Sequence, residues 1–320
     1  MYDPSKPFKG NILRLIQQSW ETPYLSVTPG YNPVFQRLVS YPEVDHTDGI
    51  GTKGYFHWNA RTFKNAVIDS LAMNLNDLVL SRATPFKLQN HIMLPADDHQ
   101  AIIEIIETFV QECTKRKIAI TGGETSIHSN LDGLEISSTI SGFVKNYKPN
   151  TFVVGDLLVG FRSAGIHSNG LTKAREVLGD SVRNEFIIPT RIYSDDLILL
   201  NESIDIHGMM HITGGAFTKL KDILTGERLH IHRNHKLTPQ PIFRSLFSHG
   251  VSETEMYRTF NCGIGFIIAV SPNDANAIIK RFDADIIGEV LSVTTRLSLN
   301  RCLANRRFVC EKFICQRIFP

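Results

Sequence analysis

The residues best placed to do chemistry together are Asp48-Gly49-Ile50-Gly51-Thr52-Lys53, an acid, two glycines, a hydroxyl group and a lysine within six positions. Backbone N–H groups of a glycine-rich turn and a lysine ammonium group bind phosphate oxygens, and a carboxylate binds the Mg²⁺ that accompanies a nucleotide. The stretch therefore predicts a site for a nucleotide phosphate and its metal. An ordinary β-turn without a ligand is the alternative that the pattern alone leaves open.

Two better-known phosphate motifs do not fit this stretch. Residues 49–54 match G-x-G-x-x-G, but a dinucleotide fingerprint needs a strand before it and a helix that begins inside it. The aromatic run 55–58 predicts a strand instead, with no helix until about residues 61–64. A Walker A loop is rejected because Gly54 follows Lys53 and no glycine precedes the lysine at the required position.

The whole chain has the composition of a soluble protein of two domains. Its 320 residues are long for one core, and its hydrophobic and charged contents are 42% and 21%. No apolar run approaches the ~18–20 residues of a membrane span, and the first residues do not predict a signal peptide. Five cysteines without a C-x-x-C pair favour neither a disulfide framework nor a zinc ribbon, so we expect a cytoplasmic protein with no membrane partner.

The net charge of +2 is unevenly distributed, because residues 301–320 carry five basic side chains and one acidic one. Such a tail can contact nucleic acid or an acidic partner, but a solvated or self-packing tail is the simpler interpretation. No basic stripe interleaved with aromatic residues occurs elsewhere, so we predict no nucleic-acid partner.

The elements that must position the glycine stretch begin with helices at residues 11–20 and 61–82. In the second helix Asp69 and Asn76 fall on one stripe, with Asp77 about 100° around the axis. An acidic stripe usually faces solvent, yet this helix is apolar nearly all round. We therefore expect a covered helix whose polar stripe faces something specific.

The rest of the first half predicts a helix after Asp97-Asp98, a strand over residues 118–120, a second tight turn over 121–125 and a strand over 135–144. A Lys-Pro-Asn break at residues 146–151 marks the predicted domain boundary. We accordingly divide the chain into domains at 1–150 and 151–300 and a basic tail of unknown role at 301–320.

The second half contains the same strand–loop–helix unit twice. A loop over residues 163–170 joins a strand at 156–161 to a helix at 171–178, and a loop over 213–216 joins a strand at 207–212 to a helix at 217–224. Each loop delivers glycines to a helix N-terminus, which is a favourable place for an anion. A strand at 263–270, a helix started by residues 271–274 and a strand at 285–291 complete this half.

Taken together, the motifs resemble the phosphoribosylformylglycinamidine cyclo-ligase family, also called aminoimidazole ribonucleotide synthetases. The resemblance covers residues 43–290 and rests on motifs that occur in the family's order: Asp48–Lys53, Asn76-Asp77-Leu78, Gly122-Gly123-Glu124-Thr125, residues 163–170, Pro189-Thr190-Arg191-Ile192-Tyr193, residues 211–215 and residues 255–265. As an ordered set they are highly specific.

The resemblance implies an α/β fold of two domains. The N-terminal α/β domain would contribute strands to a β-barrel shared by a homodimer, and the C-terminal domain would be an α/β sandwich. A long strand such as 135–144 would expose an unpaired edge in a monomer. The resemblance also implies a small-molecule substrate, ATP and Mg²⁺: ATP activates the formyl amide oxygen of the substrate, and the substrate's own nitrogen closes an imidazole ring.

The resemblance assigns roles residue by residue. Asp48, Asp77 and Glu124 would surround the metal, with Asp69 as outer support, and His167 would act in acid–base chemistry or contact a phosphate. The residues implied to bind ATP are Gly49, Gly51, Thr52, Lys53, Gly122, Gly123 and Asn169, and those implied to bind the substrate are Thr213, Gly214, Gly215, Asn261 and Arg258. Arg258 is equally well explained as a member of an ion pair.

Departures from the family pattern leave two alternatives open. The glycine-rich segment expected near the N-terminus is represented only by residues 28–32, and the third glycine, the asparagine and the Pro-Arg pair expected after residue 215 are replaced by Ala216, Lys219 and Lys221-Asp222. A sister ATP-dependent enzyme with another substrate is the first alternative. A catalytically silent nucleotide-binding dimer is the second.

Overall fold

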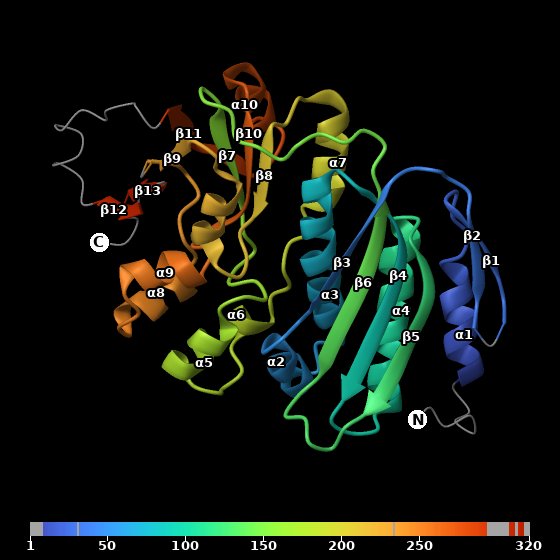
Figure 1. Ribbon diagram of the computed structural model, residues 1–320. Helices are drawn as coiled ribbons and strands as arrows, with labels where there is room; N and C mark the ends of the chain where they lie inside the picture. The colour runs from blue at the N-terminus through green and yellow to red at the C-terminus, as the bar shows by residue number, and fades with distance from the viewer. Residues whose placement is uncertain (1–8, 31, 233, 293–306, 311–312, 317–320) are drawn as a thin grey trace. The chain divides into compact units, whose positions relative to one another are not determined.

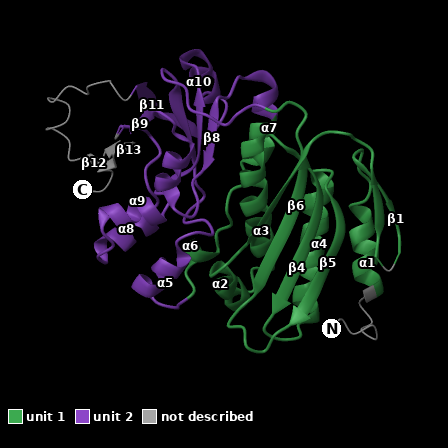
Figure 2. Ribbon diagram, viewed as in Figure 1, with its two compact units in different colours: residues 1–147, 182–198 green, residues 148–181, 199–320 purple. Residues whose placement is uncertain are grey.

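The chain divides into two compact units in the computed structural model, which describes residues 9–30, 32–232, 234–292, 307–310 and 313–316 (Figures 1 and 2). Unit 1 contains Met1–Tyr147 and also Val182–Ile198, which we call the return segment. Unit 2 contains Lys148–Ser181 and Leu199–Pro320. The boundary predicted from the sequence lies near residue 150, and the return segment was not predicted.

A four-stranded sheet forms the centre of unit 1, in the order β3 (Glu43–Gly49), β6 (Glu135–Phe143), β4 (Thr84–Leu94) and β5 (Ala119–Ile127). Neighbouring strands are antiparallel except β4 and β5, which are parallel. The expectation that the strand over 135–144 has an unpaired edge is wrong, because β6 lies between two partners. The edges of this sheet are β3 and β5.

Helices α3 (Phe63–Leu78) and α4 (His99–Lys115) build the main core of unit 1 on the sheet. Helix α3 packs against β3 and β6, α4 packs against α3 and β5, and α1 (Lys9–Gln18) packs on α4 (Figure 1). Asp98 caps α4 by accepting the N–H of Ala101 at 2.9 Å. The helix predicted over residues 61–82 corresponds to α3, which is shorter and is followed by a short 3₁₀ turn, η1 (Val79–Ser81).

A separate hairpin of β1 (Leu25–Thr28) and β2 (Val34–Arg37) belongs to a small second core in unit 1. This core joins Leu25 to Phe86, Ala119 and Phe143 of the large sheet. The segment 28–32, which stands where the family has a glycine-rich segment, lies in the hairpin loop, and its Tyr31 is outside the described residues.

The aromatic run after the glycine stretch is a helix, α2 (Lys53–Ala60), and the predicted strand there is wrong. Its buried residues, Lys53, Gly54, Phe56 and His57, recur at helical spacing and not at the alternation of a strand. Gly51 turns the chain with φ +54°, and a Cβ on Gly54 would lie 1.7 Å from the backbone oxygen of Leu134. The dinucleotide fingerprint was therefore rejected partly on a wrong ground, since a helix does follow.

The predicted tight turn over residues 121–125 is also wrong, because strand β5 runs through it. Gly122 pairs with Gln89 and Gly123 with Asn90, and a register shift just before them leaves Thr121 as an extra residue. A Cβ on Gly123 would lie 2.3 Å from Asn90 Oδ1. The glycines allow close approach to β4, which a turn would not require.

A seven-stranded sheet forms the centre of unit 2. Its order is β12 (Arg307–Cys310), β13 (Phe313–Gln316), β9 (Glu227–Ile231), β11 (Ala284–Ser292), β7 (Leu157–Arg162), β10 (Ile264–Val270) and β8 (Gly208–His211). All neighbours are antiparallel except β13 and β9. The backbone of two tail segments thus joins this sheet, and the remainder of the predicted basic tail lies outside the described residues.

Short helices accompany this sheet, namely α5 (Leu171–Leu178), α8 (Pro241–Ser248), α9 (Glu253–Thr259) and α10 (Pro272–Ile278). The predicted helix over 217–224 is the 3₁₀ helix η2 (Ala216–Ile223). In the return segment α6 (Asn184–Ile187) belongs to unit 1, and α7 (Ser194–Ser203) begins there and ends in unit 2. Within the described residues no helix combines the length and apolar character needed to cross a membrane.

Candidate functional site

The polar stripe of α3 faces the return segment and binds its backbone. Asn65 Nδ2 donates to the oxygen of Ile187 at 2.9 Å, and Asn76 Nδ2 donates to the oxygen of Arg191 at 2.9 Å. Asn76 Oδ1 accepts the N–H of Tyr193 at 2.7 Å. Buried backbone groups of a loop need such partners, so α3 fixes the path of residues 187–193.

Asp69 is the centre of this stripe and has no exposed surface. Its Oδ1 lies 2.8 Å from Lys53 Nζ and accepts both the N–H and the hydroxyl group of Thr190, at 2.7 and 2.6 Å. Its Oδ2 lies 2.8 Å from His57 Nε2. Lys53 Nζ also donates to the oxygen of Ile188 at 2.5 Å. One carboxylate therefore joins α2, α3 and the return segment.

The protonation states follow from burial and from these partners. Burial alone would raise the pKa of Asp69, but the charge of Lys53 and the hydrogen bonds from His57 and Lys53 lower it further than burial raises it. Burial lowers the pKa of His57 and of Lys53, and Asp69 opposes both shifts. The direction we adopt is a charged Lys53–Asp69 pair beside a neutral His57 that donates from Nε2.

The roles predicted for Lys53 and Asp69 must be set against this geometry. Lys53 Nζ, predicted to bind phosphate, is fully buried in an ion pair, so phosphate binding would require the ammonium group to leave it. Asp69, predicted to support a metal from outside, already meets donors from three residues. Both predictions remain predictions, and the contacts of the two side chains join α2, α3 and the return segment.

Asp48 of β3 and Asp77 of α3 are linked through two other side chains, His46 and Asn74. His46 Nε2 lies 3.5 Å from Asp77 Oδ2, and His46 Nδ1 lies 3.2 Å from Asn74 Oδ1. Asn74 Nδ2 donates to the backbone oxygen of Asp48 at 3.1 Å. The Asp48 carboxylate is half-buried and accepts the N–H of Gly49 at 2.7 Å. This hydrogen-bonded chain connects the end of β3 to α3.

Glu135 is a candidate residue that sequence reasoning missed. Burial raises its pKa, the neighbouring charge of Asp48 raises it further, and a hydrogen bond from the Gly51 backbone opposes the shift. A Cβ on Gly49 would lie 2.9 Å from its Oε1. Only the pairing of β3 with β6 brings Glu135 to the glycine stretch, and the sequence pattern contains no signal for that register.

Glu124 stands apart from this group. It is exposed on β5, directly opposite His91 of β4. In the described part of unit 1, no three acidic, histidine or cysteine side chains bring their donor atoms within 4.8 Å of one another. The predicted trio of Asp48, Asp77 and Glu124 is therefore not a ready-made metal cage.

The donor chemistry of unit 1 nevertheless fits Mg²⁺. This ion is usually held by one or two carboxylates together with phosphate oxygens and water, not by a complete protein cage. Asp48 and Glu135 supply two neighbouring carboxylates; burial is the main cause of the raised pKa of Glu135, and repulsion by the charge of Asp48 adds to it. A divalent cation would relieve that repulsion, and the backbone N–H groups of the glycine stretch lie beside it.

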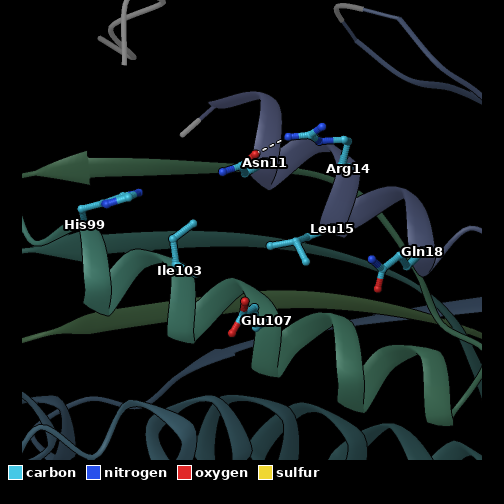
Figure 3. A pocket seen from close by; sticks show the side chains of 7 residues that line it. All are labelled: Asn11, Arg14, Leu15, Gln18, His99, Ile103 and Glu107. Atoms are coloured by element: carbon cyan, nitrogen blue, oxygen red, sulfur yellow. Dashed lines mark hydrogen bonds between the residues drawn. The ribbon is translucent and has the colours of Figure 1, made fainter. Parts of the chain in front are cut away.

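A surface hollow elsewhere in unit 1 holds none of the predicted site residues. It measures about 520 Å³ and lies between α1 and α4, where Leu15 and Ile103 face one another (Figure 3). Its rim includes Arg14, His99 and Glu107 (Figure 3). We interpret it as the imperfect seam between two amphipathic helices.

In unit 2 the loop over residues 163–170 is held in shape by its own polar groups. His167 is buried with φ +64°, and its Nε2 accepts the N–H of Ala164 at 3.1 Å. A ring nitrogen that accepts carries no proton, so this hydrogen bond assigns the ring proton to Nδ1. Nδ1–H would then be the atom of His167 that can act on a ligand, as a donor.

Asn261 also fixes the loop over residues 163–170 through hydrogen bonds to its backbone. Its Nδ2 donates to the oxygen of Gly165 at 2.8 Å, and its Oδ1 accepts the N–H of Gly263 at 2.9 Å. The second glycine loop is adjacent, since a Cβ on Gly214 would lie 3.0 Å from Asn169 Oδ1. The structure thus brings together His167, Asn169, Asn261 and the turn that contains Gly214.

The turn Thr213-Gly214-Gly215 carries the departures noted in the sequence. Ala216 has φ +41°, a conformation in which the glycine expected there would be less strained. Lys219 Nζ lies 3.4 Å from Thr213 Oγ1, whereas Asp222 is exposed. A lysine, and not the aspartate, is therefore beside the turn.

Arg258 forms an ion pair with Glu255 of its own helix, at 2.5 Å, and its side chain is 63% exposed. This favours the ion-pair interpretation of Arg258, and its predicted phosphate contact remains a prediction. Exposed pairs of this kind contribute little to stability, so the pair would not oppose release of Arg258 to a ligand.

Comparison with known proteins defines the class first. The AIR synthase related protein N-terminal domain model matches residues 40–144, and the AIR synthase related protein C-terminal domain model matches residues 153–297. A hydrogenase maturation protein HypE solved with ATP has a TM-score of 0.66 at 17% identity, covering 92% of this chain and 89% of its own. Thiamine-monophosphate kinase from Stenotrophomonas maltophilia K279a has a TM-score of 0.62 at 15% identity, covering 87% and 92%. The two family models define the class as AIR-synthase-related proteins, and the solved structures show that the α/β fold is shared with HypE and thiamine-monophosphate kinase.

Curated relatives then define the family. A phosphoribosylformylglycinamidine cyclo-ligase from Saccharolobus solfataricus is 36% identical over 234 residues, 71% of each chain. One from Methanocaldococcus jannaschii is 33% identical over 271 residues, 77% of each chain, and one from Methanothermobacter thermautotrophicus is 34% identical over 280 residues, 80% of this chain and 82% of its own. The chain belongs to the phosphoribosylformylglycinamidine cyclo-ligase family of enzymes.

The buried pair predicts a strong, non-additive effect on unfolding. Lys53→Met or Asp69→Asn leaves one buried charge without its partner, and each should lower the free energy of unfolding by about 3–5 kcal/mol. The double variant should cost clearly less than the sum. Urea unfolding followed by tryptophan fluorescence measures this in unit 1 alone, because both tryptophans, Trp20 and Trp58, lie there.

Arg37→Met is the matched control, since Arg37 pairs with Glu43 at the surface of unit 1 and its loss should change little. Additive single and double effects at positions 53 and 69 would contradict the coupling.

His57 predicts a pH dependence of unit 1. Its folded pKa lies below the ordinary value of about 6.5, so the unfolded chain binds a proton that the folded chain excludes. Stability should therefore fall as the pH is lowered below about 6.5, by up to about 1.4 kcal/mol per pH unit for this one group. His57→Gln keeps a donor for Asp69 and should reduce that slope in the tryptophan-monitored transition between pH 7 and 5. Equal slopes for the two proteins would refute this assignment.

Proposed function

We propose that this protein is a phosphoribosylformylglycinamidine cyclo-ligase that converts formylglycinamidine ribonucleotide and ATP to aminoimidazole ribonucleotide, ADP and phosphate. The observation that carries the proposal is the identity of 33–36% to relatives of that name over 71–82% of their lengths. The two family models, in the same order along the chain, support the same activity.

The chemistry proposed has two stages. The formyl amide oxygen attacks the γ-phosphorus of ATP, so that an O–P bond forms and ADP leaves. The substrate's own amine nitrogen then attacks the activated carbon, the C–O bond breaks with release of phosphate, and the nitrogen loses a proton as the imidazole ring forms. An amide oxygen leaves poorly until it is phosphorylated, and a tethered amine makes closure effectively unimolecular. The protein therefore needs phosphate binding and positioning more than a nucleophile of its own.

Unit 1 is proposed to hold the ATP phosphates and Mg²⁺. Asp48 and Asp77 would bind the metal. Glu135, which the structure places near Asp48, and Glu124, which the sequence predicted, would be further ligands. Mg²⁺, when bound, would neutralise charge on the phosphates. Gly49, Gly51, Thr52, Gly122 and Gly123 would offer N–H or hydroxyl donors. Lys53 and Asp69 are proposed as positioning residues, because their contacts fix α2 and the return segment.

Unit 2 is proposed to bind the substrate through Thr213, Gly214 and Gly215, with Asn261 shaping the neighbouring loop and Arg258 available for a phosphate. Asn169 remains the proposed ATP contact of this unit. His167 is proposed to donate an Nδ1–H hydrogen bond to a ligand oxygen, because Nε2 is already an acceptor. Of the two roles predicted for His167, acid–base chemistry and contact with a phosphate, we therefore propose contact with a phosphate.

A homodimer in the cytoplasm completes the proposal. The sheet of unit 1 has two strand edges, β3 and β5, and exposed polar pairs such as Thr47 and Thr139, whose hydroxyl oxygens lie 2.8 Å apart. A second copy that pairs strands at these edges would continue the sheet toward a shared barrel. A strictly monomeric mass at micromolar concentration would count against this part of the proposal.

The deciding experiment incubates the protein with ATP, Mg²⁺ and formylglycinamidine ribonucleotide and measures ADP and aminoimidazole ribonucleotide together. Equal amounts of the two products are expected. ADP without the imidazole would favour a sister enzyme with another substrate, which the replacements at Ala216, Lys219 and Asp222 make the second candidate. ATP binding with no turnover would favour a silent dimer.

Asp77→Asn should separate chemistry from stability. Loss of a metal-binding charge should reduce turnover by at least about a hundredfold, as loss of comparable electrostatic groups does in enzymes. The thermal midpoint should move by less than about 4 °C, since Asn has the shape of Asp and keeps polar atoms within reach of His46. Glu107→Gln, an exposed carboxylate on α4, is the control and should leave turnover unchanged. Full activity of Asp77→Asn would remove this residue from the site.

The turn in unit 2 gives a prediction about substrate charge. Asp222 is exposed while Lys219 reaches Thr213, so Asp222→Arg should change the KM for formylglycinamidine ribonucleotide by less than threefold. Lys219→Met should raise that KM about tenfold or more, because a cation next to a phosphate is lost. A tenfold gain in activity on formylglycinamidine ribonucleotide from Asp222→Arg would instead show that the natural chain is not tuned to this substrate.

A further inference from the structure

Two histidines and a glutamate meet on neighbouring strands of unit 2, outside every residue assigned above. His230 of β9 is directly opposite Glu289 of β11 in the antiparallel register. His232 follows two positions later, and its N–H continues the ladder by donating to the oxygen of Ile287 at 2.7 Å. Alternate residues of an extended chain face the same side, so both imidazoles fall on the side of Glu289.

The donor atoms of these three side chains converge. Glu289 Oε1 lies 3.4 Å from His230 Nδ1 and 3.8 Å from His232 Nε2. The two imidazole rings are 4.6 Å apart between centroids and inclined by 73°. One donor atom from each residue can be chosen so that all three lie within 4.8 Å of one another. Among the described residues this is the one group of three or more potential metal ligands with that property.

We propose that His230, His232 and Glu289 form a binding site for a first-row transition-metal dication of the Zn²⁺ type. Ligand atoms at about 2.0–2.2 Å around a tetrahedral Zn²⁺ are separated by roughly 3.3–3.6 Å. The two distances from Glu289 Oε1 are already close to that separation. Two imidazoles and one carboxylate suit Zn²⁺, Co²⁺ or Ni²⁺, whereas Mg²⁺ and Ca²⁺ take oxygen ligands.

The exposure of the three side chains suits a metal site that is fixed on one side and open to solvent on the other. The His230 side chain is 5% exposed, while those of His232 and Glu289 are 32% and 39% exposed. A buried ligand held by the sheet is fixed in advance, and the two half-exposed ligands leave one side of the site open to solvent. Three protein ligands also leave a fourth coordination position for water.

The site is independent of the proposed ATP and substrate chemistry. Its ligands come from β9 and β11, so a bound metal would cross-link two strands of the unit 2 sheet. Stability gained from such a ligand follows its free concentration. The simpler alternative is that Glu289 only accepts hydrogen bonds from the two rings, and the experiment below separates the two.

The test uses the full chain without a histidine tag, stripped with chelator and titrated with ZnCl₂ in competition with a chromophoric chelator. We expect one Zn²⁺ per chain at this site with micromolar or tighter affinity, unaffected by millimolar Mg²⁺. His232→Gln and Glu289→Gln should each weaken binding at least tenfold. Both side chains are partly exposed, and circular dichroism of each variant checks that it folds.

His249→Gln, which removes an exposed histidine from the end of α8, is the matched control and should keep the natural affinity. Co²⁺ bound to the natural protein should give visible bands without the intense near-ultraviolet absorption of a thiolate ligand, which excludes the cysteines. Zn²⁺ should raise the thermal midpoint of the natural protein and of His249→Gln but not that of the two ligand variants. No micromolar binding, or equal binding by the ligand variants, would overturn the proposal.

Discussion

The buried ion pair of Lys53 and Asp69 is the interaction on which unit 1 depends. Two charges without exposed surface are tolerated only when each is paired and hydrogen-bonded, and here Thr190, His57 and the oxygen of Ile188 complete the set. The pair binds α2 to α3 and holds the return segment against both. Since α2 begins at Lys53, the last residue of the glycine stretch, the same pair fixes the direction in which that stretch leaves the sheet.

This arrangement explains which parts of the site the sequence revealed. The stripe of Asp69 and Asn76 on an otherwise apolar helix correctly indicated a covered partner, because a buried polar side chain must have one. The partner itself, residues 187–193, is more than a hundred positions away, and no local pattern announces it. Lys53 was assigned to phosphate from its place in a glycine-rich run. Only the fold shows that its ammonium group points to Asp69.

Long strands and helices with clear periods were predicted well, and elements that depend on register or close packing were not. The helix α5 and the strands β6, β7, β10 and β11 were found within about two residues. Strand β4, in the interior of the unit 1 sheet, was not predicted: Phe86 and Leu88 alternate with Lys87 and Gln89, but Pro85 before them and the polar Asn90 after them break the pattern. The turn expected at Gly122–Gly123 is a strand for the opposite reason, since those glycines serve contact with Asn90. Glu135 reaches Asp48 by strand pairing alone.

The acidic residues of unit 1 therefore fall into two groups, one whose oxygens are enclosed by hydrogen-bond donors of the fold and one whose oxygens are partly exposed. Asp69 is enclosed by donors that the fold itself supplies, so replacing them with a metal or a phosphate would dismantle the packing of α2 and the return segment. Asp48, Asp77 and Glu135 retain partial exposure, and the pKa of Glu135 is raised mainly by burial and further by the charge of Asp48. Partly exposed carboxylates, one of which has a pKa shifted by burial and by a neighbouring charge, are candidates for binding a ligand. That contrast is the physical reason to seek the metal and the phosphates at the glycine stretch and to regard Asp69 as the anchor that keeps the stretch in place.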